Sequence, residues 1–167
     1  MFAEPLLLKA TAVETMGLPA LLETPLKGEY LLHDATRSAR FYGLPWHPPA
    51  SMSFSSVAAE RAVVWAADYA RLDPEPLVVA LYRRAWADGG DISTVSAVAD
   101  LAASIGIECD RVRDGIESAE TKANLSDRVV QAVRRGIFGS PFIVVDGEAF
   151  WGADRLCMVE RWLDGGW

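Results

Sequence analysis

The clearest pattern of apolar and polar positions lies near the end of the chain, where two short apolar runs flank an Asp-Gly pair. The first run, residues 142–145, reads Phe-Ile-Val-Val, and β-branched residues of this kind favour a strand. Asp146-Gly147 supplies two residues that accept the positive φ angles of a tight hairpin turn. The pattern predicts a β-hairpin with Pro141 at the start of its first strand, because proline cannot donate a hydrogen bond within a ladder.

The residues after the hairpin predict a C-terminal helix. Leu156, Val159 and Leu163 recur at helical spacing and form an apolar stripe. Asp154 precedes them and is the predicted N-cap, since a carboxylate accepts hydrogen bonds from the free N–H groups of the first turn.

The middle of the chain predicts a block of helices. Ser53 or Ser55 is the expected cap of the first helix, Asp91 and Ser93 start a later one, and Asp110 caps a short one. An uninterrupted helical block between an early strand and a late hairpin is typical of a helical insertion in a small α/β domain. The helices expected from apolar spacing cover residues 54–71, 74–86, 91–106, a short segment from 110, and 119–135.

Composition limits the classes of protein. The 167 residues are 51% hydrophobic, which is enough for one sizeable core in a single domain. The net charge of −7, without a cluster of Lys and Arg, argues against nucleic-acid binding. No apolar run approaches the roughly 18 residues of a membrane span, and no basic segment leads into an apolar one at the N-terminus. A cytoplasmic protein is therefore expected.

The cysteines and histidines exclude two kinds of site. Cys109 and Cys157 lie far apart, so the chain has no Cys-x-x-Cys pair for disulfide exchange. Cys157 lies among apolar residues and is interpreted as a small core residue rather than a reactive thiol. His33 and His47 have no metal-ligand spacing with each other or with the cysteines, so a metal site is not expected.

The bond before Pro141 admits two interpretations. A trans bond at a plain strand start is the commoner arrangement of X–Pro in folded proteins. A cis bond would turn the backbone N–H and C=O of Ser140 outward, where they could pair with an extended peptide as an added strand does.

Residues 136–141, the hairpin and residues 150–156 resemble the C-terminal signature of 2-hydroxychromene-2-carboxylate isomerases and kappa-class glutathione transferases, the glutathione-using branch of the DsbA-like thioredoxin superfamily. Residues 25–32 are similar to the family segment that carries a lysine for glutathione, and residues 91–93 extend the resemblance. It implies an α/β fold, a single DsbA-like thioredoxin domain over residues 1–167 with a helical insertion at about 26–117. It also favours the cis bond.

The resemblance implies a glutathione site. Lys27 would meet a carboxylate, Ser140 would pair with the peptide backbone of the cysteinyl residue, and Asp154 would take the γ-glutamyl ammonium. Roles without ligand binding stay open, because Lys27 could be a solvated surface charge and Asp154 only a helix cap. The implied glutathione-binding residues are Lys27, Ser140, Pro141, Ala153, Asp154 and Arg155. The implied substrate pocket contains Tyr30, Trp46 and Trp151. Packing in the core is the alternative role of the two tryptophans.

One part of the family pattern has no counterpart. Family members begin with a strand and a Ser-Pro at a helix N-terminus, and that serine stabilises the glutathione thiolate. Residues 1–6 already resemble the second strand, so the first strand is missing and no catalytic residue is assigned. Unpaired backbone is then expected beside residues 5–8 and 141–145. Lost upstream residues, a strand from another copy, or a rearrangement of residues 1–8 would fill the gap.

The function implied by the resemblance is glutathione-dependent isomerisation, or a closely related glutathione transfer, on an aromatic substrate by reversible thiolate addition. A homodimer is expected by the same analogy. The alternative is a non-catalytic thioredoxin-fold binding or assembly module. Absence of the serine favours the module, whereas Lys27, Ser140-Pro141 and Asp154 favour a ligand site.

Overall fold

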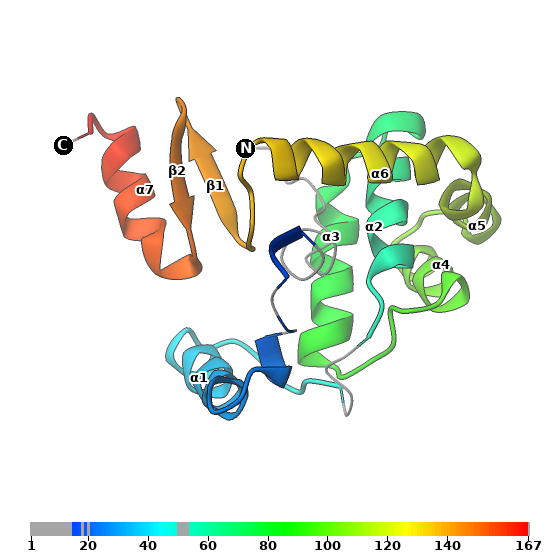
Figure 1. The fold of residues 1–167 in the computed structure, drawn as a ribbon. Helices are drawn as coiled ribbons and strands as arrows, with labels where there is room; N and C mark the ends of the chain where they lie inside the picture. The colour runs from blue at the N-terminus through cyan, green and yellow to red at the C-terminus, as the bar shows by residue number, and fades with distance from the viewer. Residues whose placement is uncertain (1–14, 18, 20, 50–53, 167) are drawn as a thin grey trace.

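The computed structural model describes residues 15–17, 19, 21–49 and 54–166, and helices make up most of this part (Figure 1). Figure 1 shows the hairpin and the last helix at one end, a block of helices at the other, and α1 apart from both. The elements are η2 (Leu21–Glu23), α1 (Lys27–Phe41), α2 (Val57–Val64), η3 (Trp65–Tyr69), α3 (Glu75–Tyr82), η4 (Arg83–Ala87), α4 (Val95–Ser104), α5 (Cys109–Glu117), α6 (Ala119–Arg134), β1 (Phe142–Val145), β2 (Glu148–Trp151), η5 (Ala153–Arg155) and α7 (Leu156–Leu163).

The main core lies inside the helical block formed by α2 to α5, and α6 packs against α2 and α5. Small side chains allow the helix backbones to approach closely while larger ones fill the space between them. The fully buried side chains of this core include Ala62, Ala66, Leu77, Val98, Ala102, Val112 and Ile116. All of these residues lie within the helices that the apolar spacing of the sequence predicted.

Two of the core helices end in a wide turn of the π type. The N–H of Ala70 donates to the carbonyl of Trp65 at 2.9 Å, and that of Asp88 donates to Arg83 at 3.0 Å. Each bond spans five residues instead of the four of an α-helix. With these turns, η3 and η4, the helical structure covers residues 57–69 and 75–87, against the predicted ranges 54–71 and 74–86.

The predicted helix starts are corrected by one to four residues. α2 begins after Ser56, which makes no side-chain cap. The Ser55 hydroxyl accepts from the N–H of Val57 at 3.4 Å but lies one residue before the N-cap position, and Ser53 lies outside the described residues. α4 is capped by Thr94, whose hydroxyl accepts from the N–H of Ala97 at 3.1 Å. Asp91 instead accepts from the N–H of Ser93 at 2.7 Å, in a turn before the helix.

The shorter helix that follows is also corrected at its start. α5 begins at Cys109 with Glu108 in the N-cap position, so Asp110 lies inside the helix and does not cap it. The predicted span of α6 is confirmed within one residue, and Ser118 caps it by accepting from the N–H of Thr121.

The predicted hairpin is confirmed. β1 and β2 are antiparallel, with Phe142 opposite Trp151 and Val145 opposite Glu148. The turn residues have positive φ angles, 51° at Asp146 and 87° at Gly147, as the Asp-Gly pair predicted. The Ser140–Pro141 bond is cis. Residues 5–8, predicted to lie beside β1, are outside the described residues.

The C-terminal helix packs less than its sequence suggested. Val159 is buried, but Leu156 and Leu163 are 52% and 65% exposed, so most of the predicted apolar stripe faces away from the core. Cys157 is exposed, and its interpretation as a core residue is wrong. No helix of the described part has both the length and the apolar character that a membrane crossing needs.

Candidate functional site

The hairpin brings the cis-proline bond and the start of the last helix together. The N–H of Gly152 donates to the carbonyl of Pro141 at 3.0 Å, one step beyond the Phe142–Trp151 pair. Ser140 and Pro141 therefore lie beside the segment that carries Ala153 to Arg155. Most of the predicted glutathione-binding residues thus gather at one end of the sheet.

The backbone groups of Ser140 at this end have no partner in the part of the chain that the structure describes. Ser140 is exposed and forms no hydrogen bond with another described residue. Gly139 before it is buried against Trp151, and a Cβ atom there would overlap the indole nitrogen. The backbone thus runs close to the Trp151 ring and leaves the N–H and C=O of Ser140 open to a partner.

Asp154 does not cap the last helix, which corrects the sequence prediction. It lies in η5, and the N-cap positions of η5 and α7 are Gly152 and Arg155. Its carboxylate instead accepts from Nη1 of Arg155 at 2.6 Å. The two side chains are 72% and 48% exposed, so an anion and a cation stand side by side in solvent.

Trp151 is an exposed ring beside the cis-proline bond. It is 55% exposed, and its ring lies edge-on to Phe138 with the centroids 4.8 Å apart. Phe138 also contacts Phe142 edge-on at 5.5 Å. Phe150, which points to the other face of the strand, is 5% exposed and belongs to the packing.

The other predicted residues lie on α1 and the loop after it. Lys27 is exposed at the first position of α1, and its side chain forms no hydrogen bond or ion pair with a described residue. Tyr30 is 56% exposed and accepts a hydrogen bond from Arg37 at 3.1 Å. No hydrogen bond, ion pair or ring contact of the described part joins Lys27, Tyr30 or Trp46 to the hairpin.

Trp46 has a partner that sequence reasoning missed. Its indole ring stacks on that of Trp86, with the centroids 5.5 Å apart and the planes 1° from parallel. Phe54 contacts the same Trp86 ring at 5.6 Å. All three side chains are half-buried. The two tryptophans are forty positions apart, so no local pattern reveals this pair.

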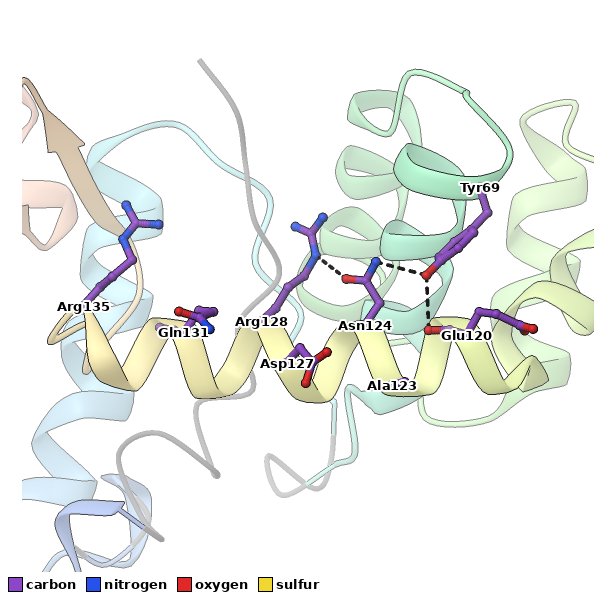
Figure 2. A pocket seen from close by; sticks show the side chains of 9 residues that line it. Tyr69, Glu120, Ala123, Asn124, Asp127, Arg128, Gln131 and Arg135 are labelled. Carbon is purple, nitrogen blue, oxygen red and sulfur yellow. Dashed lines mark hydrogen bonds between the residues drawn. The ribbon is translucent and has the colours of Figure 1, made fainter.

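A groove of about 770 Å³ runs along α6 and ends at Tyr69 of η3 (Figure 2). Asn124 donates to the Tyr69 hydroxyl at 3.2 Å and to Asp68 at 2.9 Å, while Nε of Arg128 donates to Asn124 at 2.9 Å. Arg128 also pairs with Asp68 at 2.7 Å. These polar groups are engaged with one another and hold η3 against α6.

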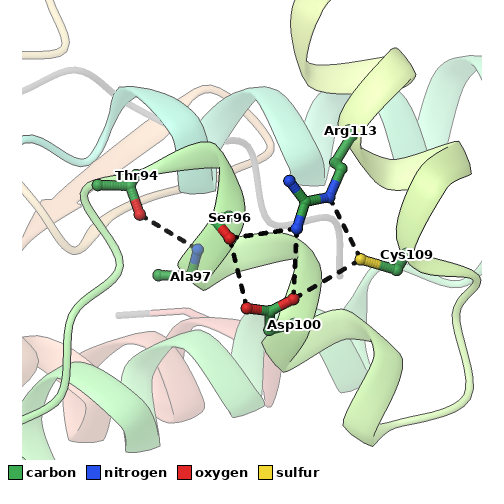
Figure 3. A network of polar contacts seen from close by, with 6 residues as sticks. All are labelled: Thr94, Ser96, Ala97, Asp100, Cys109 and Arg113. Atoms are coloured by element: carbon green, nitrogen blue, oxygen red, sulfur yellow. Dashed lines mark hydrogen bonds and ion pairs between the residues drawn. The ribbon is translucent and has the colours of Figure 1, made fainter.

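A second polar network joins α4 and α5 (Figure 3). Nε of Arg113 donates to Sγ of Cys109 at 3.4 Å, and its Nη2 donates to Ser96 and Asp100 at 3.1 and 3.4 Å. The hydrogen bond with the Cys109 thiol is the leading cause that raises the pKa of Arg113 above its usual value. Within the described residues, no group of three or more His, Cys, Asp or Glu side chains could hold a metal ion.

Glu60 is a titratable group that sequence reasoning did not single out. Its Oε1 accepts from the Ser56 hydroxyl at 2.6 Å, whereas its buried Oε2 has no hydrogen-bond partner. Burial raises the pKa of Glu60 to about 7. The signal in the sequence was a Glu-Arg pair, Glu60-Arg61, inside an otherwise apolar helix.

Known proteins resemble this chain along most of its length. The family model of the DSBA-like thioredoxin domain matches residues 2–164. A 2-hydroxychromene-2-carboxylate isomerase of Sphingobium xenophagum is 30% identical over 145 residues, which are 87% of this chain and 72% of that protein. The glutathione S-transferase kappa 2 of Caenorhabditis elegans is 29% identical over 162 residues, 90% of this chain and 71% of that protein.

A solved structure has the same fold. The structure of a 2-hydroxychromene-2-carboxylate isomerase superposes with a TM-score of 0.82 at 22% identity, covering 96% of this chain and 78% of that one. At this identity the similarity concerns the fold.

Proposed function

This chain belongs to the DSBA-like thioredoxin domain family, and we propose that it is a glutathione-dependent isomerase of the 2-hydroxychromene-2-carboxylate isomerase type, or a closely related glutathione transferase. The observation that carries the proposal is the exposed backbone of Ser140 before a cis proline, next to the Asp154–Arg155 pair. The names of the relatives from Sphingobium xenophagum and Caenorhabditis elegans support the two activities.

The residues at this end of the sheet fit a tripeptide with charged ends. The free N–H and C=O of Ser140 can pair with an extended backbone. Asp154 and Arg155 offer an anion and a cation 2.6 Å apart, which suits the ammonium and carboxylate of a γ-glutamyl group. Ala153 contributes its backbone at the start of η5. Lys27 is assigned to a further carboxylate of the tripeptide.

Glutathione, when bound, supplies a thiol that can add reversibly to a conjugated carbon of the substrate. The chain's own residues bind and orient the tripeptide, and no residue is assigned to activate the thiol. The proposed pocket for an aromatic substrate comprises Trp151 beside Ser140, together with Tyr30 and Trp46, which no described contact joins to the hairpin. Flat apolar rings favour offset or edge-on contacts with such side chains.

Calorimetric titration with glutathione tests the binding site. We expect heat of binding and a higher melting temperature in millimolar glutathione, since a ligand that binds only the folded state stabilises it. Asp154→Asn should weaken binding about tenfold, because a charge-assisted hydrogen bond is lost. Asp164→Asn, an exposed carboxylate at the C-terminal end of α7, is the matched control and should change nothing.

Absorbance assays with 2-hydroxychromene-2-carboxylate, with and without glutathione, test the reaction. Turnover that requires glutathione supports the proposed isomerase. Glutathione binding without turnover of this acid or of conjugation substrates would contradict the enzyme and favour the binding or assembly module. If glutathione gave neither heat of binding nor a higher melting temperature, the proposed binding site at Ser140 would be contradicted as well.

The proposal also includes the cellular compartment and the oligomeric state of the protein. We place it in the cytoplasm and as a homodimer, by analogy with the family. Light scattering coupled to gel filtration should give twice the monomer mass of 18.2 kDa, and a monomeric mass at the concentration of the assay would contradict the dimer.

A further inference from the structure

We infer that Trp86 is a positioning residue, which holds the Trp46 ring in the orientation that lets the proposed pocket select flat aromatic substrates. This inference rests on the proposed function, because it concerns the substrate side of the same site. It starts from the parallel stacking of the two indoles, 5.5 Å apart at 1°. A ring stacked in this way cannot turn about its χ2 angle without losing the contact.

The backbone around Trp46 is fixed to the same partner. The N–H of His47 donates to the carbonyl of Trp86 at 2.8 Å, and Nδ1 of His47 lies 2.9 Å from the carbonyl oxygen of Ala87. The loop therefore makes polar contacts with the end of η4 directly beside the stacked rings. Side chain and backbone of the Trp46–His47 segment are held by the same two residues of η4.

The turn after η4 leaves space for this contact. Gly89 has a φ of 64°, and a Cβ atom at this position would stand 2.9 Å from the carbonyl oxygen of His47. A larger residue would push the loop away from the helix end. Phe54 closes the arrangement by packing on the Trp86 ring at 5.6 Å.

A fixed indole discriminates among substrates by their shape. Trp46 is half-buried, and Trp86 covers one face of its ring. A flat aromatic substrate can stack on a ring whose plane is set in advance, and it then avoids the entropy cost of ordering that ring. A bent or aliphatic acid of similar size gains little from such a surface.

The test compares Trp86→Leu, which removes the flat ring, with Trp86→Phe, which keeps one. We expect Trp86→Leu to raise the KM for the aromatic substrate about 5- to 10-fold, the value of one stacking contact, with kcat changed less than about twofold. Trp86→Phe should restore most of the loss. Tyr82→Leu, exposed at the end of α3, is the control and should leave KM unchanged.

A spectroscopic signature reports the stacking itself. Indoles held in fixed contact contribute to the near-ultraviolet circular dichroism, and Trp46→Phe and Trp86→Leu should both reduce this signal. Loss of the signal without a rise in KM would overturn the inference, as would an equal rise in KM for Tyr82→Leu. Should Trp86→Leu not fold, Gly89→Ala displaces the loop while keeping both rings and should raise KM in the same way.

A binding measurement distinguishes failure of this inference from failure of the proposed function. If the wild type does not turn over the aromatic acid, binding of 1-naphthoate is measured by quenching of tryptophan fluorescence. Weaker binding to Trp86→Leu than to the wild type and to Tyr82→Leu then supports the role of Trp86. Equal binding, or no binding to the wild type, overturns it.

Discussion

Gly115 of α5 lies directly against the indole of Trp65, so closely that a Cβ atom at position 115 would overlap Cγ and Cδ1 of that ring. Trp65 is 8% exposed and starts the wide turn η3. A residue without a side chain is therefore what allows α5 to approach the end of α2. The close packing of the helical block depends on this contact.

Gly115→Ala should lower the free energy of unfolding by about 1–2 kcal/mol, although alanine is the better helix former. Overpacking of a core costs about 1–3 kcal/mol, and overlap with the rigid, buried Trp65 ring belongs in the upper part of that range, so the cost exceeds the helix-propensity gain of about 1 kcal/mol. Urea unfolding measures the difference, with the exposed neighbour Asp114→Ala as control. The loss should shrink when Trp65→Phe provides room, and an equal loss in both backgrounds would contradict the contact as its cause.

Ser118→Ala should cost about 1–2 kcal/mol of stability, because it removes two hydrogen bonds at the start of α6. The Ser118 hydroxyl donates to Oγ1 of Thr121 at 2.9 Å and accepts from its N–H at 3.1 Å. Thr121 is fully buried, so its groups are left without a partner. Ser126→Ala, exposed on the same helix, should change stability by less than about 0.5 kcal/mol in the same thermal and urea unfolding experiments.

Glu60 should make the protein less stable as the pH rises from about 4.5 to 7. Its pKa is about 7 in the folded state against 4.5 for the exposed group, so the folded state binds more protons in this range. The free energy of unfolding then falls by up to about 3 kcal/mol and levels off above the folded pKa. Unfolding by urea between pH 4 and 9 measures the slope.

Glu60→Gln should flatten that slope, because an amide does not titrate. The variant keeps an acceptor for the Ser56 hydroxyl. Glu117→Gln, exposed at the end of α5, is the control and should retain the wild-type slope. A slope that persists in Glu60→Gln would assign the pH dependence to other groups.

Arg128→Ala should destabilise the protein by about 1–2 kcal/mol and loosen the end of η3 from α6. Arg128 and Asp68 are 27% and 29% exposed, so their 2.7 Å ion pair is partly shielded from solvent. Loss of Arg128 also frees the side-chain oxygen of Asn124. Hydrogen exchange should rise at residues 65–70 in this variant and stay unchanged in the exposed Arg134→Ala.

The DsbA-like thioredoxin fold and the family were predictable from the sequence, and both are confirmed by the family match and the solved relative. The reason is that their signals are local. Asp146-Gly147 determines the hairpin turn within two residues, and the cis bond belongs to the segment 136–141 that resembles the family. Helical spacing located the helices of the block from α2 to α6 for the same reason.

The features that the sequence did not reveal depend on contacts that its patterns do not specify. Asp154 is a residue type that favours the N-cap, but its carboxylate accepts a hydrogen bond from the neighbouring Arg155. Cys157 stands among apolar residues, yet only Val159 of its helix is buried. The pairing of Trp46 with Trp86 depends on how a loop meets a helix end, which no periodicity encodes. The proposed roles of Lys27, Ser140 and Asp154 stay predictions until binding is measured.

The wide turn η3 holds one residue more than a regular helical turn of the same height. If residues 65–69 continued as an ordinary α-helix, the end of the turn would be rotated by up to about 100° around the helix axis. Asp68 and Tyr69 would then point away from Asn124 and Arg128. A regular turn here would thus remove the polar contacts that join η3 to α6, so the wide turn determines the direction in which these side chains point.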